Sequence, residues 1–372
     1  LWMQYGFKAD ALIHFGTHGS LEFTPKKQVA LSSDDWPDRL VGAVPHFYVY
    51  SIGNVGEGMI AKRRSYAGLQ SYLTPPFLES NVRGMYRDLM EKVKVYNTCL
   101  SAEGGRDEAA EQKAALAVKA ATVKLGIHRD LGLDSVLSTP YPEEDILRVE
   151  NFAEELATEK ITGQLYTMGV PYEPERILSS VYSMTVEPIA YSLLALDKQR
   201  GKADERVLKH QSVFTQLYLN PARELVGKQL KQSAAVTDAQ ICQIAGITPE
   251  ELAKARRIVE ERNAPQGMMA RMMAMQQGGN TGKGKPEYTK GEISFALAVA
   301  ELERTIRNIG NYRQQLYNSP EQELSSLINA MNGGYPAPSP GGDPIVNPNT
   351  LPTGRNMFAI NAEETPTEAA WE

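Results

Sequence analysis

The chain has 372 residues, a formal net charge of −6 at pH 7 and two distant cysteines, Cys99 and Cys242. A nearly neutral chain is not a general polyanion binder, so we expect no nucleic-acid partner. The two cysteines exclude a disulfide scaffold and a multi-cysteine metal site, and they suit a reducing, cytoplasmic location. No apolar run reaches the roughly 18–20 residues that span a bilayer, so we expect no membrane span.

The fold class predicted from the pattern is mixed α/β and mostly helical. Residues 1–78 are predicted to form an α/β segment, with strands over 11–15 and 47–52 and a helix over 59–72 that prolines then stop. This segment also holds three of the five histidines and many of the aromatic residues. Such crowding indicates that the segment carries the functional site, although an aromatic-rich β core is the competing interpretation.

Residues 79–232 are predicted to form a helical domain. Apolar residues recur at helical spacing over 82–100, 108–125, 143–157, 174–199 and 205–232. Pro188 and Pro221 each lie inside one of these patterns, and a proline there should kink or divide the helix.

The last part of the chain is predicted to contain a smaller helical unit, residues 233–330, and a Pro/Gly-rich extended segment, residues 331–372. In the helical unit we expect helices over 250–263, 291–317 and 323–331, with capping signals before the first and the last. Residues 267–275 are a methionine-rich insertion. We interpret the insertion as an exposed helix end or gap-filling core rather than a soft-metal contact.

The strongest local motif is HFGTHGSLE, residues 14–22, in which His14, His18 and Glu22 recur at a spacing of four. The glycines speak against a continuous helix, so a strand end followed by a turn would bring the side chains together. Imidazole and carboxylate groups can relay protons near neutral pH or bind a divalent metal. Structural histidines that fulfil packing roles remain the alternative.

A second motif is a glycine loop followed by a basic helix, with Glu57 in the loop and Lys62, Arg63 and Arg64 after it. A strand, a glycine loop and a helix start can cradle an anion, because backbone N–H groups point outward there. Consecutive helical residues differ by about 100°, so the three cations cannot all face one ligand. An ordinary solvated helix is the competing interpretation. The chain has no P-loop, since residues 278–284 lack its spacing.

The run HFGTHGSLEFTP, residues 14–25, resembles the signature of the large, tetrapyrrole-binding subunit of the cobaltochelatase and magnesium chelatase family. Further blocks fit that family in the same order. They are PHFY at 45–48, AKRR at 61–64, YLTPP at 72–76, PGGDP at 340–344 and LPTGRN at 351–356. Family members are much longer, and the chain opens and stops abruptly, so we expect a fragment that continues beyond both ends.

The resemblance implies a ligase-type enzyme that inserts a divalent metal, Co or Mg, into a tetrapyrrole ring. ATPase partner subunits, rather than this fragment, would use the ATP. In this interpretation Glu22 is the base or the metal-delivering carboxylate, His14 and His18 are metal contacts or proton relays, and Glu57 is a second carboxylate. The metal would occupy His14, His18 and Glu22 only transiently. The cations that would hold a ring carboxylate are Lys62, Arg63 or Arg64.

Two other functions fit the same residues. A related branch in haem-using anaerobes is associated with removing iron from haem. Two departures from the family pattern make this reverse reaction an alternative function. Lys26 stands where the family usually has glycine, and the methionine-rich insertion is the second departure. The third hypothesis is a tetrapyrrole-binding protein without catalysis, which would use the same pocket.

Overall fold

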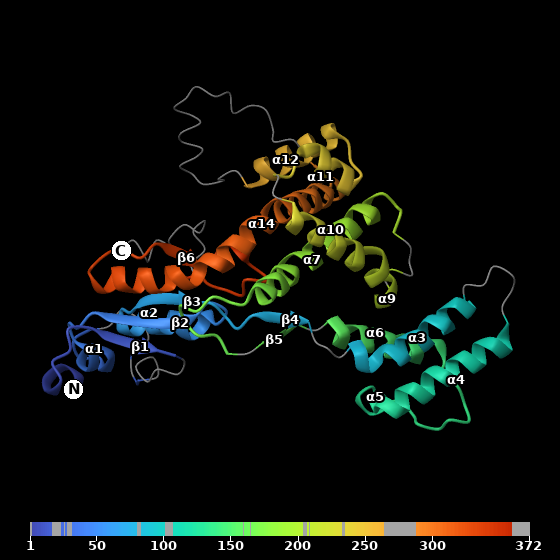
Figure 1. Ribbon diagram of the computed structural model, residues 1–372, viewed down its shortest axis with the longest axis horizontal. Coiled ribbons are helices and arrows are strands. Elements are labelled where there is room, and N and C mark those ends of the chain that lie inside the picture. The colour runs from blue at the N-terminus through green and yellow to red at the C-terminus, as the bar shows by residue number, and fades with distance from the viewer. Residues whose placement is uncertain are drawn as a thin grey trace.

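The computed structural model of the chain is mixed α/β and mostly helical, as predicted (Figure 1). The structure describes residues 2–16, 24, 25, 27, 32–79, 83–100, 107–158, 160–163, 165–203, 207, 209–232, 235–263 and 288–358. In Figure 1 the main sheet lies at one end of the molecule, while α3, α4 and α6 lie at the other. The first and the last described residues of the chain are both at the sheet end.

The main sheet has five strands in the order β1-β2-β3-β7-β6. Strands β1 (Leu12–Phe15), β2 (His46–Ser51) and β3 (Gly68–Tyr72) are parallel. Strand β7 (Asn356–Phe358) pairs antiparallel with β3, and β6 (Pro338–Pro340) pairs parallel with β7. The two predicted strands are therefore confirmed, and the proline-rich segment after residue 331 completes the sheet.

The predicted helix over residues 59–72 is wrong in its second half. Helix α2 spans Val55–Ser65 and ends at Tyr66, whose φ of 54° is left-handed. Residues 68–72 form β3 instead. Its central residues Leu69, Gln70 and Ser71 point alternately to the two faces of the sheet and are all buried, and both α2 and the long helix α14 (Lys290–Met331) contact the strand. A strand covered on both faces shows no alternation of apolar and polar residues, which hides it in the sequence.

Helix α2 lies close against the sheet at Gly58. A Cβ atom at this position would lie 3.0 Å from Leu69 Cδ2, which is too close for an ordinary contact. The small residue therefore lets the first turn of α2 approach β3, and it sets the position of the neighbouring Glu57.

The helices of the middle of the chain match the predicted ranges. They are α3 (Arg83–Leu100), α4 (Glu108–Leu125), α6 (Glu143–Thr158) and α7 (Pro174–Gln199). The short helix α5 (Ile127–Asp130) is not among the predicted ones. Helix α7 continues undivided through Pro188. The pattern over 205–232 is divided into α9 (Gln211–Phe214), the π-helix η2 (Thr215–Leu219) and α10 (Asn220–Lys231), with Pro221 in the first turn of α10.

Several short elements connect the main strands and helices, and two further helices follow residue 235. The short ones are the π-helix η1 (Trp2–Gly6), α1 (Trp36–Val41), the strand pair β4 (Phe77–Glu79) and β5 (Lys160–Thr162), and the 3₁₀ turn η3 (Pro348–Thr350). Helices α11 (Asp238–Ala245) and α12 (Pro249–Asn263) precede the methionine-rich insertion, which lies outside the described residues.

Helix α14 (Lys290–Met331) is one continuous helix of 42 residues, where the sequence predicts two. Pro320 lies inside it and is buried. A proline in a helix removes one backbone hydrogen bond. The Ser319 hydroxyl donates to the Gln315 carbonyl at 2.8 Å and accepts from the Thr353 backbone N–H at 3.0 Å. These contacts hold the C-terminal segment against the helix at the point where the break was expected.

Glu323 of α14 joins this helix to the end of β3. Its carboxylate is fully buried and accepts hydrogen bonds from Leu73 N at 2.8 Å, Thr353 Oγ1 at 2.6 Å, Tyr166 Oη at 2.6 Å and Gly169 N at 3.3 Å. Four donors from three segments that are distant in the sequence thus meet one side chain. A buried carboxylate is tolerated only when its oxygens are satisfied in this way.

We expect Glu323→Ala to lower the free energy of unfolding by about 3 kcal/mol or more, since it leaves buried donors without an acceptor. Urea denaturation measures the change. The matched control is Glu321→Ala on the exposed side of the same helix, which should change stability by less than about 0.5 kcal/mol. Equal effects of the two variants would show that the Glu323 contacts do not stabilise the fold.

Burial raises the pKa of Glu323 above its usual value of 4.5, even though its hydrogen bonds act in the opposite direction. The folded protein therefore binds this proton more tightly than the unfolded chain does. The resulting contribution to stability is complete below pH 4.5 and is lost as the pH rises through the raised pKa.

Glu323→Gln removes this titration. We expect the free energy of unfolding of the wild type, relative to that of the variant, to fall as the pH rises from about 4 to 7. Urea denaturation of both proteins at a series of pH values measures this difference in the free energy of unfolding. The other titrating groups contribute equally to both proteins, so their contributions cancel. A difference that stays constant over this range would rule out a raised pKa.

Candidate functional site

The three parallel strands end at the same edge of the sheet, which we call the carboxyl edge. Strand β1 ends at Phe15, β2 at Ser51 and β3 at Tyr72. In open parallel sheets, ligands bind in the crevice outside the carboxyl ends of the strands. The predicted motif begins at His14 in β1, so its first residues lie at this edge.

His14 is half-buried on β1 and lies beside Tyr48 of β2 in the strand register. The two ring centroids are 4.5 Å apart, and the ring of His46 is stacked 6.1 Å from that of His14. The imidazole of His14 therefore lies on the same face of the sheet as the tyrosines of β2. This is the face that α2 covers.

Glu57 lies in the first turn of α2, over the same tyrosines. Tyr48 Oη donates to Glu57 Oε1 at 3.0 Å, and Tyr50 Oη donates to Glu57 Oε2 at 2.9 Å. The Asn54 amide donates to Tyr50 Oη at 2.8 Å. A carboxylate is also favoured at a helix N-terminus by the helix dipole. Tyr48 thus contacts both His14 and Glu57, which brings two of the predicted catalytic residues together.

An aromatic row lies on the opposite face of the carboxyl edge. Phe15 is 59% exposed and stacks on Tyr72 with a centroid distance of 5.7 Å and an interplanar angle of 9°. Tyr72 in turn stacks on Tyr166 at 6.2 Å. Burial is the main reason why the pKa of Tyr72 and that of Tyr166 are raised, with the Glu323 carboxylate as a second cause. These phenols stay neutral, and the exposed face of Phe15 is open to a planar ligand.

The three basic residues of α2 have different surroundings. Lys62 Nζ donates to Asn356 Oδ1 and to the Met357 carbonyl, both at 2.7 Å, so it binds β7. Burial lowers the pKa of Lys62. Arg63 is exposed on the helix, and the side chain of Arg64 lies outside the described part of the chain.

His18 and Glu22 lie outside the described residues, which resume at Thr24. The proposed metal ligands His14, His18 and Glu22 therefore remain a prediction. Elsewhere in the described ranges, no group of three or more histidine, cysteine or acidic side chains is arranged to hold a metal ion. None of the described helices is long and apolar enough to cross a membrane.

Segments far apart in the sequence converge at the carboxyl edge. The Gly342 N–H donates to the Ile52 carbonyl at 2.9 Å, just after β2 ends. Gly341 lies so close to the start of α2 that a Cβ atom there would be 2.9 Å from Val55 Cγ2. Gly354 N–H donates to the Ser71 carbonyl at 2.9 Å. The PGGDP and LPTGRN blocks thus frame the loops that follow β2 and β3.

The sequence interpretation missed the residues that connect the candidate side chains. Tyr48 and Tyr50 hold Glu57, and Glu323 holds the segment after β3. A signal for the first pair exists, because His46, Tyr48 and Tyr50 alternate and must share one face of a strand. For Glu323 the sequence carries no such signal, since its four donors come from three segments that are far apart in the sequence.

The whole chain, residues 1–372, matches a family model described as CobN/Magnesium Chelatase, so the chain belongs to this family. It is 28% identical over 372 residues to the magnesium-chelatase subunit ChlH of Oryza sativa, covering 98% of this chain and 25% of that protein. It is 26% identical over 392 residues to the aerobic cobaltochelatase subunit CobN of a Sinorhizobium species, covering 100% of this chain and 28% of that protein.

Among solved structures, the catalytic subunit of cobaltochelatase from Mycobacterium tuberculosis shares the fold. The TM-score is 0.58 at 22% sequence identity, and the match covers 98% of this chain and 26% of that one. The chain thus spans about a quarter of the length of these relatives.

The contacts of Lys62 predict a role in stability. Lys62→Met removes two hydrogen bonds to β7 and should lower the free energy of unfolding by about 1–3 kcal/mol. Arg63→Met removes the same charge from an exposed position of the same helix, and it should cost less than about 0.5 kcal/mol. Urea denaturation measures the free energy of unfolding of both variants. A Lys62 variant as stable as the Arg63 variant would contradict a structural role for this ammonium group.

Proposed function

We propose that the carboxyl edge is the metal-insertion site of a chelatase large subunit, and that the substrates are a tetrapyrrole and a divalent metal, Co or Mg. The observation that carries this proposal is the contact of Tyr48 with both His14 and Glu57, at the end of the strand from which the sequence continues to His18 and Glu22. Membership of the CobN/magnesium chelatase family supports the same reaction class.

The chemistry of insertion needs a proton acceptor. A divalent metal that enters the ring displaces two pyrrole N–H protons, and it must also shed its water. In our proposal Glu22 takes up a proton or delivers the metal, and His14 and His18 contact the metal or relay protons. Glu57 is the second carboxylate, oriented by the hydroxyls of Tyr48 and Tyr50. Imidazole and carboxylate side chains can both accept and release protons in such an exchange.

The ring itself needs an apolar wall and cations at its rim. The exposed face of Phe15, backed by Tyr72, offers the wall. In our proposal a ring carboxylate binds Arg63, which is exposed, rather than Lys62, which is engaged with β7. A guanidinium group binds carboxylates with two parallel hydrogen bonds. ATPase subunits would act as partners and use the ATP.

The test uses the full-length protein with a metal-free tetrapyrrole, Co²⁺ or Mg²⁺, and the ATPase partners, followed by absorption spectroscopy. Glu22→Gln should lower kcat by about 10²-fold or more, since it removes a proton acceptor. Glu57→Gln should reduce kcat less, because the amide keeps one acceptor for the tyrosines. Arg63→Glu should raise the KM for the ring. The control Glu321→Gln should leave both constants unchanged.

Three outcomes would contradict the proposal. A Glu22→Gln protein that works at the normal rate would remove Glu22 from the mechanism. Loss of iron from added haem, with no insertion into the metal-free ring, would assign the reverse reaction. Ring binding without any spectral change in the presence of metal and partners would assign a non-catalytic role.

A further inference from the structure

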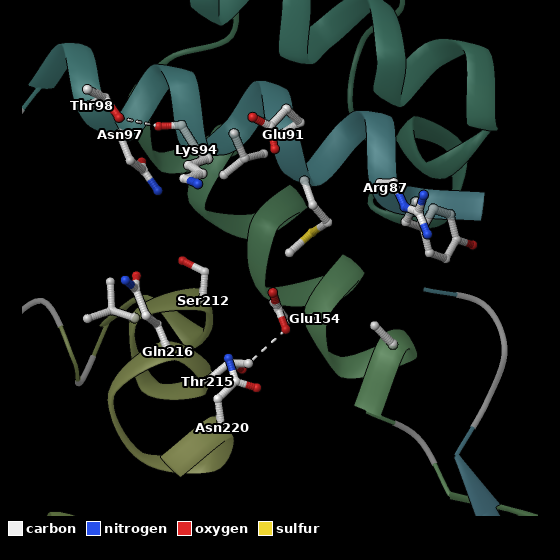
Figure 2. Close-up of a pocket in the computed structure, with 15 residues that line it drawn as sticks. Arg87, Glu91, Lys94, Asn97, Thr98, Glu154, Ser212, Thr215, Gln216 and Asn220 are labelled. Atoms are coloured by element: carbon white, nitrogen blue, oxygen red, sulfur yellow. Dashed lines mark hydrogen bonds between the residues drawn. The ribbon is translucent and has the colours of Figure 1, made fainter. Parts of the chain in front are cut away.

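A cavity of about 770 Å³ lies between α3, α6 and the α9–η2–α10 segment, away from the carboxyl edge (Figure 2). Polar side chains around it hydrogen-bond to the two buried carboxylates of α6. Thr215 Oγ1 donates to Glu154 Oε2 at 3.2 Å, and both Asn97 and Ser212 donate to the fully buried Glu150. These hydrogen bonds have a structural role, because they join α6 to α3 and to the α9–η2 segment.

A hydrogen bond at the carboxyl edge, in contrast, runs against the usual preference of its residue. Asn54 is the N-cap residue of α2, and asparagine is among the residues that most often cap a helix by accepting from its first N–H groups. Within the described residues, the Asn54 side chain makes no such capping hydrogen bond. Its amide donates instead to Tyr50 Oη at 2.8 Å. The side chain therefore binds the tyrosine of β2 in place of the helix that it precedes.

The chemistry of the three groups fixes the direction of the Tyr50 proton. A phenol has one proton to donate, and an ionised carboxylate can only accept. Because Tyr50 Oη donates to Glu57 Oε2 at 2.9 Å, the same oxygen can bind Asn54 only as an acceptor. The NH₂ group of Asn54 supplies the donor that this requires. An acceptor in place of the amide would compete with Glu57 for the proton.

The backbone around Asn54 is held on both sides. Its own N–H donates to the Ser51 carbonyl at 3.2 Å, and the Gly342 N–H donates to the Ile52 carbonyl at 2.9 Å. Tyr50 is fully buried in β2, so its hydroxyl depends on protein partners. The amide, the phenol and the carboxylate thus form a hydrogen-bonded chain that is in place before a substrate binds.

We propose that Asn54 is a positioning residue of the insertion reaction. By donating to Tyr50, it directs the phenol proton to Glu57, and this hydrogen bond keeps Glu57 ionised and oriented as the second carboxylate. In this role Asn54 contacts neither the ring nor the metal and acts only through Tyr50. The proposal rests on the proposed function, because it concerns the part that Glu57 plays there, whereas the hydrogen-bonded chain itself does not.

The experiment measures metal insertion by the full-length Asn54→Asp protein with its ATPase partners. Aspartate caps a helix as well as asparagine does, but it offers only acceptors, so a mere capping role predicts an unchanged kcat. We expect kcat to fall by about tenfold, with the KM for the ring unchanged. Asn54→Thr, a neutral N-cap residue without the amide donor, should lower kcat as well, which separates loss of the donor from added charge.

The matched control is Asn318→Asp on α14. The Asn318 side chain is exposed, and its oxygen accepts from Gln314 Nε2 at 2.8 Å, a contact that aspartate retains. Both kinetic constants should equal those of the wild type. A double-mutant cycle gives a second readout. In the Glu57→Gln protein, Asn54→Asp should change kcat by less than about twofold, since the group that it positions is already lost.

Wild-type kcat in the Asn54→Asp protein would overturn the positioning role. An equal fall in kcat with and without Glu57→Gln would overturn it as well. Failure of the proposed function looks different, because the wild type then inserts no metal and the role in that reaction falls with it. Non-additive effects of Asn54→Asp and Tyr50→Phe on the free energy of unfolding would still support the hydrogen-bonded chain, and additive effects would overturn it.

Discussion

Parallel pairing of β1, β2 and β3 is the constraint on which the rest of the structure depends. Parallel strands need crossover connections, and their carboxyl ends meet at one edge. Here that edge receives the end of β1, the glycine loop before α2 and the segment after β3. The pairing also sets His14 beside Tyr48, and Tyr48 in turn reaches Glu57.

The C-terminal segment closes the same sheet. Strand β7 pairs with β3, Lys62 of α2 binds Asn356 and Met357, and Glu323 of α14 binds Leu73 and Thr353. The edge is therefore built from segments near both ends of the chain. The helices α3 to α14 lie between these segments in the sequence. This arrangement explains why blocks that resemble the family occur near both ends of the sequence and meet in space.

Local patterns in the sequence were enough to predict most helices, because α4 and α7 begin with a capping residue or a first-turn proline, and α3 and α6 have a clear apolar face. They failed where tertiary contacts override local signals. Residues 68–72 form a strand because β2 and β7 flank them, and α14 continues through Pro320 where the tail packs against it. His14 and Glu57 could be predicted as candidates, but their connection through Tyr48 depends on strand register.

The central claim is that the tetrapyrrole reacts at the carboxyl edge. A cryo-EM structure of the full-length protein with a metal-free ring tests it most directly. The account predicts ring density against the exposed face of Phe15, at the end of β1 that carries His14. Ring density confined to another part of the protein, with Phe15 uncovered, would contradict it.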